Sequence, residues 1–183
     1  MRNIKIIFNA LKSLSSKKLI QLLKLTIPHP LFSMMGFYAT LRSFSLAQKH
    51  YPNTHSNNGK GNAFRHALWN CLILMYCCKI SSPEKALDFC ERMTSMHEEL
   101  FPNEPLETKM DLHNNKVGRD YFMQLLPGIH RQFFETSFFV EELKNKTQSA
   151  TVLKKIEDDF GDSLVYVKKS YIKRPLLIVV ASI

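Results

Sequence analysis

The chain has 183 residues, of which 45% are hydrophobic and 11% aromatic, so it can bury the core of one domain, and global disorder is excluded. The net charge of +9 is unevenly spread: residues 1–83 contain eleven Lys and Arg and no Asp or Glu, whereas the rest contains fourteen Lys and Arg and sixteen Asp and Glu. A half-chain without acid favours an anionic partner, a phospholipid surface or nucleic acid, although a basic half that packs on the acidic half would give the same counts.

The pattern predicts helices nearly throughout, and the first is expected over residues 3–25, ending before Pro28. It carries an apolar stripe with lysines beside it. This basic amphipathic segment, residues 1–27, either lies on anionic lipid or packs on its own domain, and the sequence leaves both readings open. Its lysines interrupt any apolar run of a secretory signal, so no clear signal peptide is predicted.

A second helix is expected over residues 31–50, and the Pro, Asn and Gly residues of 51–60 indicate a loop. The next segment, about residues 62–78, is apolar on almost every side, which is typical of a helix buried at the centre of a bundle. It also contains three of the four cysteines, Cys71, Cys77 and Cys78; the fourth is Cys90. Their spacing fits no zinc motif, so buried thiols in a reducing compartment are the simplest interpretation.

Ser82-Pro83-Glu84 is a helix start, because Ser caps the backbone, Pro fits the first helical position and an acid complements the dipole. We expect that helix to end at residues 97–100. A further helix is expected over residues 111–126, before Pro-Gly.

The remaining segments are less distinctive: residues 131–143 predict a helix or a strand, and 151–171 a charged helix. The sequence therefore indicates an all-α, single-domain helical bundle whose core spans residues 28–172. An apolar tail, residues 173–183, follows and is too short to cross a membrane.

The most informative stretch is residues 110–120, MDLHNNKVGRD, in which Asp111, Asn115 and Arg119 are four residues apart. On a helix these side chains form one stripe, with Asn114 and Gly118 beside it. A glycine at this point lets another backbone or a ligand come close. A solvated helix face does not require such a selection of residues.

Two other segments carry similar chemistry: residues 61–70, GNAFRHALWN, and the pair His97-Glu98. His66 and Arg65 lie on a helix that is otherwise apolar, where burial is costly unless the side chains are bound to something. A single buried His is more often a satisfied core residue. The convergence of three polar segments favours a common site.

Imidazoles and carboxylates in this combination suit two chemistries. They can hold a divalent metal with a position left for water, or they can act as general acid and base while Arg and Asn stabilise negative charge. As catalytic residues we predict His66, His97, Glu98 and Asp111; as substrate-binding residues Asn62, Arg65, Asn114, Asn115 and Arg119; and as metal ligands His66, His97, Asp111 and His113.

The motifs NAFRHALWN, then HE, then MDLHNNxVGR resemble an uncharacterised bacterial helical domain, DUF6973-like, that also occurs in polymorphic-toxin-like proteins. The resemblance covers roughly residues 57–122. It implies a shared polar site, a bacterial source and an effector role, but no established reaction. A looser similarity to the HD-type metal phosphohydrolases departs from their pattern, since Glu98 stands where those enzymes have Asp.

These observations predict a hydrolase that acts on a phosphate-containing or lipid substrate, with a divalent metal of unknown identity and an anionic membrane surface as partner. The alternative is a non-catalytic helical module whose polar residues form a structural network and whose basic half binds membrane or protein. Nucleic-acid binding ranks last, because the basic residues are not clustered with aromatics. We expect a cytoplasmic or peripherally membrane-associated protein.

Overall fold

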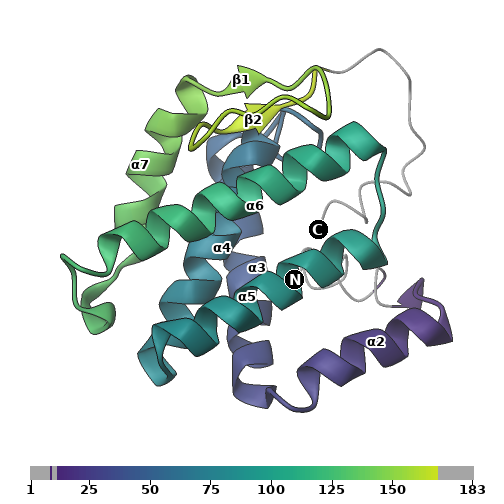
Figure 1. The fold of residues 1–183 in the computed structure, drawn as a ribbon, viewed down its shortest axis with the longest axis vertical. Helices are drawn as coiled ribbons and strands as arrows, with labels where there is room; N and C mark the ends of the chain where they lie inside the picture. Colours follow the sequence, from purple (N-terminus) through teal and green to yellow (C-terminus); the bar gives the residue numbers. More distant parts are fainter. Residues whose placement is uncertain (1–8, 10–11, 169–183) are drawn as a thin grey trace.

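The computed structural model describes residue 9 and residues 12–168. The described part folds into helices α2 (Ser16–Thr26), α3 (Pro30–His50), α4 (Lys60–Ile80), α5 (Pro83–Leu100), α6 (Pro105–Leu125) and α7 (Thr136–Gln148) (Figure 1). A short 3-10 helix, η1 (Arg131–Phe133), precedes α7, and two strands, β1 (Thr151–Val152) and β2 (Val165–Tyr166), pair in parallel. The predicted all-α bundle is confirmed.

Helix α4 is the centre of this bundle. Residues 61–75 are all buried, and α4 contacts α3, α5, α6 and α7. An almost uniformly apolar sequence is what such a position requires, because every face of the helix meets another element. The prediction of a buried central helix over about residues 62–78 is therefore confirmed, and the few polar residues of α4 are buried with it.

The predicted first helix is interrupted within the described residues. A turn precedes Ser15, which caps α2 by accepting a hydrogen bond from the Lys18 backbone N–H. The expectation of one helix over residues 3–25 is wrong at this point, because a Ser side chain that accepts from the third residue after it marks a new helix start. The rest of that prediction, residues 3–8, 10 and 11, lies outside the described residues.

The starts of the other helices follow local signals. Ser82 caps α5 as predicted, with its side chain accepting from the Lys85 backbone N–H. Helix α6 begins at Pro105, well before Asp111, because proline is compatible with the first turn of a helix and needs no donor there. The extension gives the polar stripe of α6 a full helical turn of support on its amino-terminal side.

The segment after α7 is not helical as far as the structure describes it. The predicted helix over residues 151–171 is wrong: residues 151–168 form the two short strands and turns. The cause is tertiary, since the Asn114 side chain bonds both backbone groups of Val165 and so takes the place of a neighbouring strand. The apolar tail, residues 173–183, lies outside the described residues.

Among the described residues, no helix is both long enough and apolar enough to cross a membrane.

Candidate functional site

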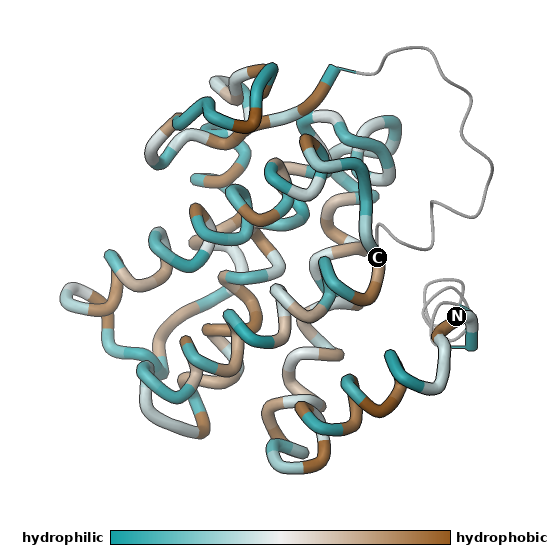
Figure 2. Tube along the Cα trace, turned by 45° about the vertical axis from the view of Figure 1, so that its right-hand side comes forward, coloured by the Kyte–Doolittle hydropathy of each residue, from teal (hydrophilic) through white to brown (hydrophobic). Residues whose placement is uncertain are grey.

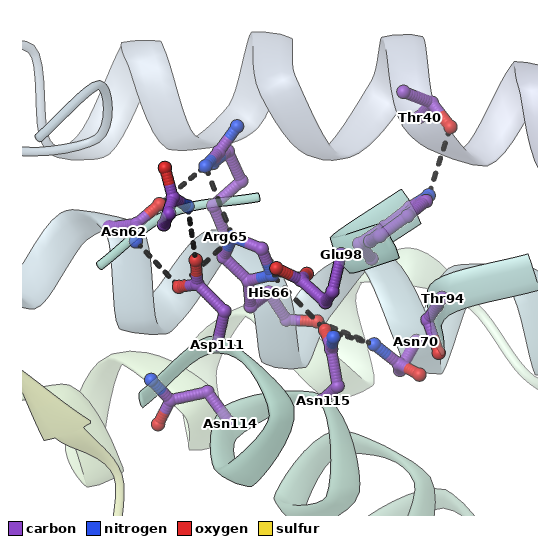
Figure 3. A network of polar contacts seen from close by, with 12 residues as sticks. Thr40, Asn62, Arg65, His66, Asn70, Thr94, Glu98, Asp111, Asn114 and Asn115 are labelled. Carbon is purple, nitrogen blue, oxygen red and sulfur yellow. Dashed lines mark hydrogen bonds and ion pairs between the residues drawn. The ribbon is translucent and has the colours of Figure 1, made fainter. Parts of the chain in front are cut away.

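Three polar pairs join α4 to α6, and we call them the polar ladder: Asn62 with Asp111, His66 with Asn115, and Asn70 with Arg119. Figure 3 shows the first two pairs. Asn62 Nδ2 donates to Asp111 Oδ1 over 2.9 Å, His66 Nδ1 lies 3.1 Å from Asn115 Oδ1, and Arg119 Nη1 donates to Asn70 Oδ1 over 3.1 Å. Successive members are four residues apart on both helices, so one turn of α4 meets one turn of α6 at each pair.

The ladder forms because α6 packs closely on α4. A Cβ on Gly118 would lie 2.2 Å from the carbonyl oxygen of Ala67, so only glycine allows this approach. A glycine at position 118 predicts a close contact with either a backbone or a ligand. The neighbour is the backbone of α4.

His66 has a defined tautomer in this setting. Asn115 Oδ1 also accepts from Asn70 Nδ2 over 2.8 Å, so it is an acceptor, and His66 Nδ1 must donate to it. The other nitrogen, Nε2, therefore carries a lone pair, which accepts from Arg65 Nη2 over 3.2 Å and lies 3.4 Å from Asp111 Oδ1. Burial, followed by the Arg65 charge, lowers the pKa of His66, which keeps the ring neutral.

Two buried carboxyl groups flank this ring. Glu98 of α5 places Oε1 4.0 Å from His66 Nδ1, and Asp111 lies at Nε2. Burial raises the pKa of Asp111 to about 7, and burial together with the nearby Asp111 raises the pKa of Glu98 to about 8. Arg65 counteracts this effect on Asp111, because its positive charge favours the ionised carboxylate. Its guanidinium donates to Asn62 Oδ1, and burial lowers the pKa of Arg65 to about 10.

The balance of charge is negative. Arg65 faces Asp111 and Glu98, and a third acid, Glu107, is buried one turn before Asp111 and disfavours its ionisation. With His66 neutral, Asp111 and Glu98 in their ionised forms outnumber the guanidinium of Arg65. A buried surplus of this kind is relieved by a proton or by a cation.

Three polar atoms in the same place lack a hydrogen-bond partner among the described residues: Arg65 Nε, Glu98 Oε1 and Asn115 Nδ2. Each belongs to a side chain that is at least 94% buried. Buried groups of native proteins are paired with few exceptions, and unpaired ones concentrate where a ligand, ion or water acts. Their convergence around His66 singles out this region from the rest of the core.

His66, Glu98 and Asp111 form a group that fits a metal ion, with one ligand atom from each residue and all three atoms within 4.8 Å of one another. The 3.4 Å between His66 Nε2 and Asp111 Oδ1 is close to the separation of two ligands on a zinc-sized ion, since each bond is about 2.0–2.1 Å long. The Nδ1–H of His66 donates to a side-chain oxygen, as metal-bound histidines do. Against a metal stands Arg65, which occupies the Nε2 lone pair.

Four predicted site residues lie apart from this group. His113 bonds the Ser163 carbonyl oxygen through Nε2 over 2.8 Å, and Asn114 holds β2, so both face the strands. His97 packs its ring on Trp69 and Phe101, with its centroid 6.4 Å from that of His66. Arg119 closes the far end of the ladder. The structure therefore brings together Asn62, Arg65, His66, Glu98, Asp111 and Asn115.

Three residues that bond to members of the site were not among the predicted site residues. Asn70 bonds Asn115 and Arg119, Thr94 accepts from Arg119 over 3.3 Å, and Asn103 donates to Asp111 Oδ2 over 3.4 Å. Asn70 follows His66 by four residues, so helical spacing was a usable signal for it. Asn103 lies in the α5–α6 connection, where no periodicity points to a contact.

A small pocket between α3 and α4 reaches the site from outside. It is lined by Thr40, Ser43, Phe44, Arg65, His66 and Trp69. Its volume is about 10 Å³, which is room for about one water molecule and far below the roughly 300–1,000 Å³ of pockets for drug-sized ligands. A substrate group therefore reaches Arg65 and His66 only if the side chains that line the pocket move.

Cysteine chemistry does not operate here. All four cysteines are free and buried. Burial raises the pKa of Cys77 and Cys78 to about 12, and raises that of Cys71 and Cys90 further. Thiols that stay protonated at neutral pH are poor nucleophiles and poor ligands.

Fold and site together define a class of all-α proteins with a buried polar centre between two closely packed helices. The chain belongs to the family described as "Domain of unknown function (DUF6973)", whose model matches residues 23–151. The match extends beyond the motifs at residues 57–122 on both sides, and it includes the whole polar ladder. Neither the curated proteins nor the solved structures contain a significant match to the chain.

Proposed function

We propose that the protein is a metal-dependent hydrolase with His66, Glu98 and Asp111 at its centre, acting on a phosphate-containing group or a lipid ester. The proposal rests on the surroundings of the two ring nitrogens of His66. One nitrogen is fixed as a donor to Asn115, and the other lies with its lone pair 3.4 Å from a carboxylate oxygen. Glu98 contributes an unpartnered oxygen from a third helix.

Arg65 supports an anionic substrate. Its guanidinium lines the small pocket, and its Nε has no hydrogen-bond partner among the described residues. A planar guanidinium matches the oxygens of a phosphoryl group. Binding of an ion at His66 Nε2 requires Arg65 to leave that nitrogen, and an anionic group in the pocket gives the guanidinium a new partner. The pocket holds about one water molecule, so binding of a phosphoryl group requires the side chains that line it to move apart.

Metal analysis of the purified full-length protein tests the proposal. We expect about one divalent ion per chain, and we expect Asp111→Asn to weaken ion binding at least about tenfold. Asp120→Asn is the matched control, since Asp120 is a partly exposed acid on the same helix and pairs only with Lys116 among the described residues. Equal ion content in wild type and Asp111→Asn overturns the assignment of the ligands.

A hydrolase screen with phosphate mono- and diesters and with lipid esters tests the reaction. We expect activity in wild type, stimulated by the bound metal, and its loss in Asp111→Asn and Glu98→Gln. If the wild type hydrolyses none of these substrates and binds no ion, the hydrolase proposal is rejected.

The second candidate is a binding module in which the polar ladder only fixes helix packing. The near-complete burial of Asn62, Asn70 and Asn115, and the bonds that they share with neighbouring side chains, favour it. Glu98→Gln separates the two candidates, because none of the three ladder hydrogen bonds ends on Glu98. If the ladder is only structural, this variant keeps the melting temperature of the wild type, and neither protein hydrolyses any substrate. The effector role implied by the family resemblance stays a prediction.

A further inference from the structure

The outer sides of α2 and of the first half of α3 carry large apolar side chains that are exposed. We call them the apolar face: Leu19, Ile20, Leu23, Ile27, Leu31, Met34, Phe37 and Tyr38. The spacing of four residues between Leu19, Leu23 and Ile27 puts these three along one side of α2, and Leu31 follows directly after the α2–α3 turn. Soluble surfaces expose single apolar residues routinely, but eight large exposed apolar side chains on two consecutive helices indicate a docking surface.

The helix that carries half of this face is peripheral. Helix α2 lies at the edge of the bundle, below the carboxyl-terminal end of α5 (Figure 1). Along its tube, hydrophobic and hydrophilic residues alternate (Figure 2). Its inner side is held by Leu25, which is buried, and by hydrogen bonds from Lys18 to the Leu100 carbonyl and from Gln21 to Glu99. These contacts fix α2 with its apolar side outward, where Ile20, Leu23 and Ile27 line a shallow groove with Lys24.

The charges around the apolar face are basic. Lys17 and Lys24 are exposed on α2, and Arg42 and Lys49 are exposed further along α3. No acid belongs to either helix, since the chain has none before Glu84. The nearest acids come from other elements: Glu99 is engaged by Gln21, and Glu84 and Asp88 of α5 border the groove beside Leu31.

We propose that the apolar face docks on an anionic membrane surface. Aliphatic and aromatic side chains enter the boundary between headgroups and acyl chains, while the lysines beside them keep their ammonium groups at the lipid phosphates. Phe37 and Tyr38 are residue types that favour this boundary. A second copy of the chain on the same face would bring the lysines of two α2 helices together, which charge repulsion opposes. The proposal does not depend on the proposed hydrolase.

Vesicle sedimentation with the full-length protein tests this. We expect the protein to pellet with phosphatidylcholine vesicles that contain phosphatidylglycerol, and to bind vesicles of phosphatidylcholine alone at least about tenfold more weakly. Ile27→Gln with Met34→Gln removes apolar contacts without changing charge, and Lys17→Gln with Lys24→Gln removes charge without changing the apolar side chains. Both double variants should lose most of the binding, with circular dichroism unchanged.

Matched controls lie away from the face. Ile156→Gln replaces an apolar residue that is 51% exposed, and Lys154→Gln with Lys155→Gln removes two exposed charges. All three substitutions should leave binding at the wild-type level, as should Asp111→Asn. Equal pelleting of the face variants and the controls overturns the proposal. So does a wild-type dimer in lipid-free solution that Ile27→Gln with Met34→Gln abolishes, because the face then serves a second copy.

Discussion

At the scale of single residues, Asn115 holds the site together. Its Oδ1 accepts from both His66 Nδ1 and Asn70 Nδ2. Asn115→Ala leaves the Nδ1–H of His66 and one of the two Nδ2–H groups of Asn70 without an acceptor, at roughly 1–3 kcal/mol each, while Asn70 Nδ2 keeps its bond to the His66 carbonyl. We expect the free energy of unfolding to fall by about 2–5 kcal/mol, measured by urea denaturation.

Leu112→Ala is the control for this substitution, because Leu112 lies on the same helix and is 41% exposed. It should change the free energy of unfolding by no more than about 0.5 kcal/mol. A similarly small change in Asn115→Ala would mean that the ladder bonds contribute little, and that His66 is oriented by packing alone.

Helical spacing predicted the ladder residues on α6 but not which of their neighbours share the site. Asp111, Asn115 and Arg119 follow the spacing of four and all lie in the ladder. His113 comes two residues after Asp111, about 200° around the helix, so geometry alone places it on another side. Asn114 was assigned to the site because it adjoins the stripe in sequence, but its side chain bonds the backbone of Val165 in β2.

At the scale of elements, the contact between α4 and α6 at Gly118 sets the spacing of the ladder. In Gly118→Ala the new methyl group meets the Ala67 backbone, which cannot turn away as a side chain can. We expect a loss of about 3 kcal/mol or more of stability, and weaker binding of any ion at His66, because α6 must move outward.

Gly128→Ala controls for the substitution itself, since its nearest neighbour would be 3.9 Å from the new Cβ. Thermal unfolding should show a large fall in melting temperature for Gly118→Ala and a small change for Gly128→Ala. Equal melting temperatures would show that the helices can separate without cost, contrary to the close packing observed.

Elements with their own start and stop signals could be predicted from the sequence, and elements fixed by a distant partner could not. Ser82 and Pro83 open α5 where expected, and the apolar run of α4 indicated its central position. Strand β2 has no such local signal, because its backbone is held by Asn114 and by a short parallel pairing with β1.

At the scale of the whole molecule, the buried carboxyl groups connect stability to pH. The pKa of Asp111 is raised to about 7 and that of Glu98 to about 8, whereas both ionise near pH 4 in the unfolded chain. Above pH 4 the folded state therefore binds more protons than the unfolded state, and stability falls as the pH rises through 7 and 8. His66 and His97 act in the opposite direction, since their lowered pKa values make stability rise with pH, but only up to about pH 6.5.

Between pH 6.5 and 8 the carboxyl groups consequently dominate, and we expect the free energy of unfolding, measured in the presence of a chelator, to decrease by up to about 1.4 kcal/mol per pH unit for each proton released. Glu98→Gln should flatten the decrease, because a neutral amide replaces the group that must ionise. The buried thiols stay protonated in the folded state and contribute equally in both proteins, so the difference between them isolates Glu98. A divalent ion held by the same carboxylates should also flatten it, since bound metal lowers their proton affinity. A stability that rises over this range would mean that Arg65 keeps both carboxylates ionised, and that neither is available as a proton donor.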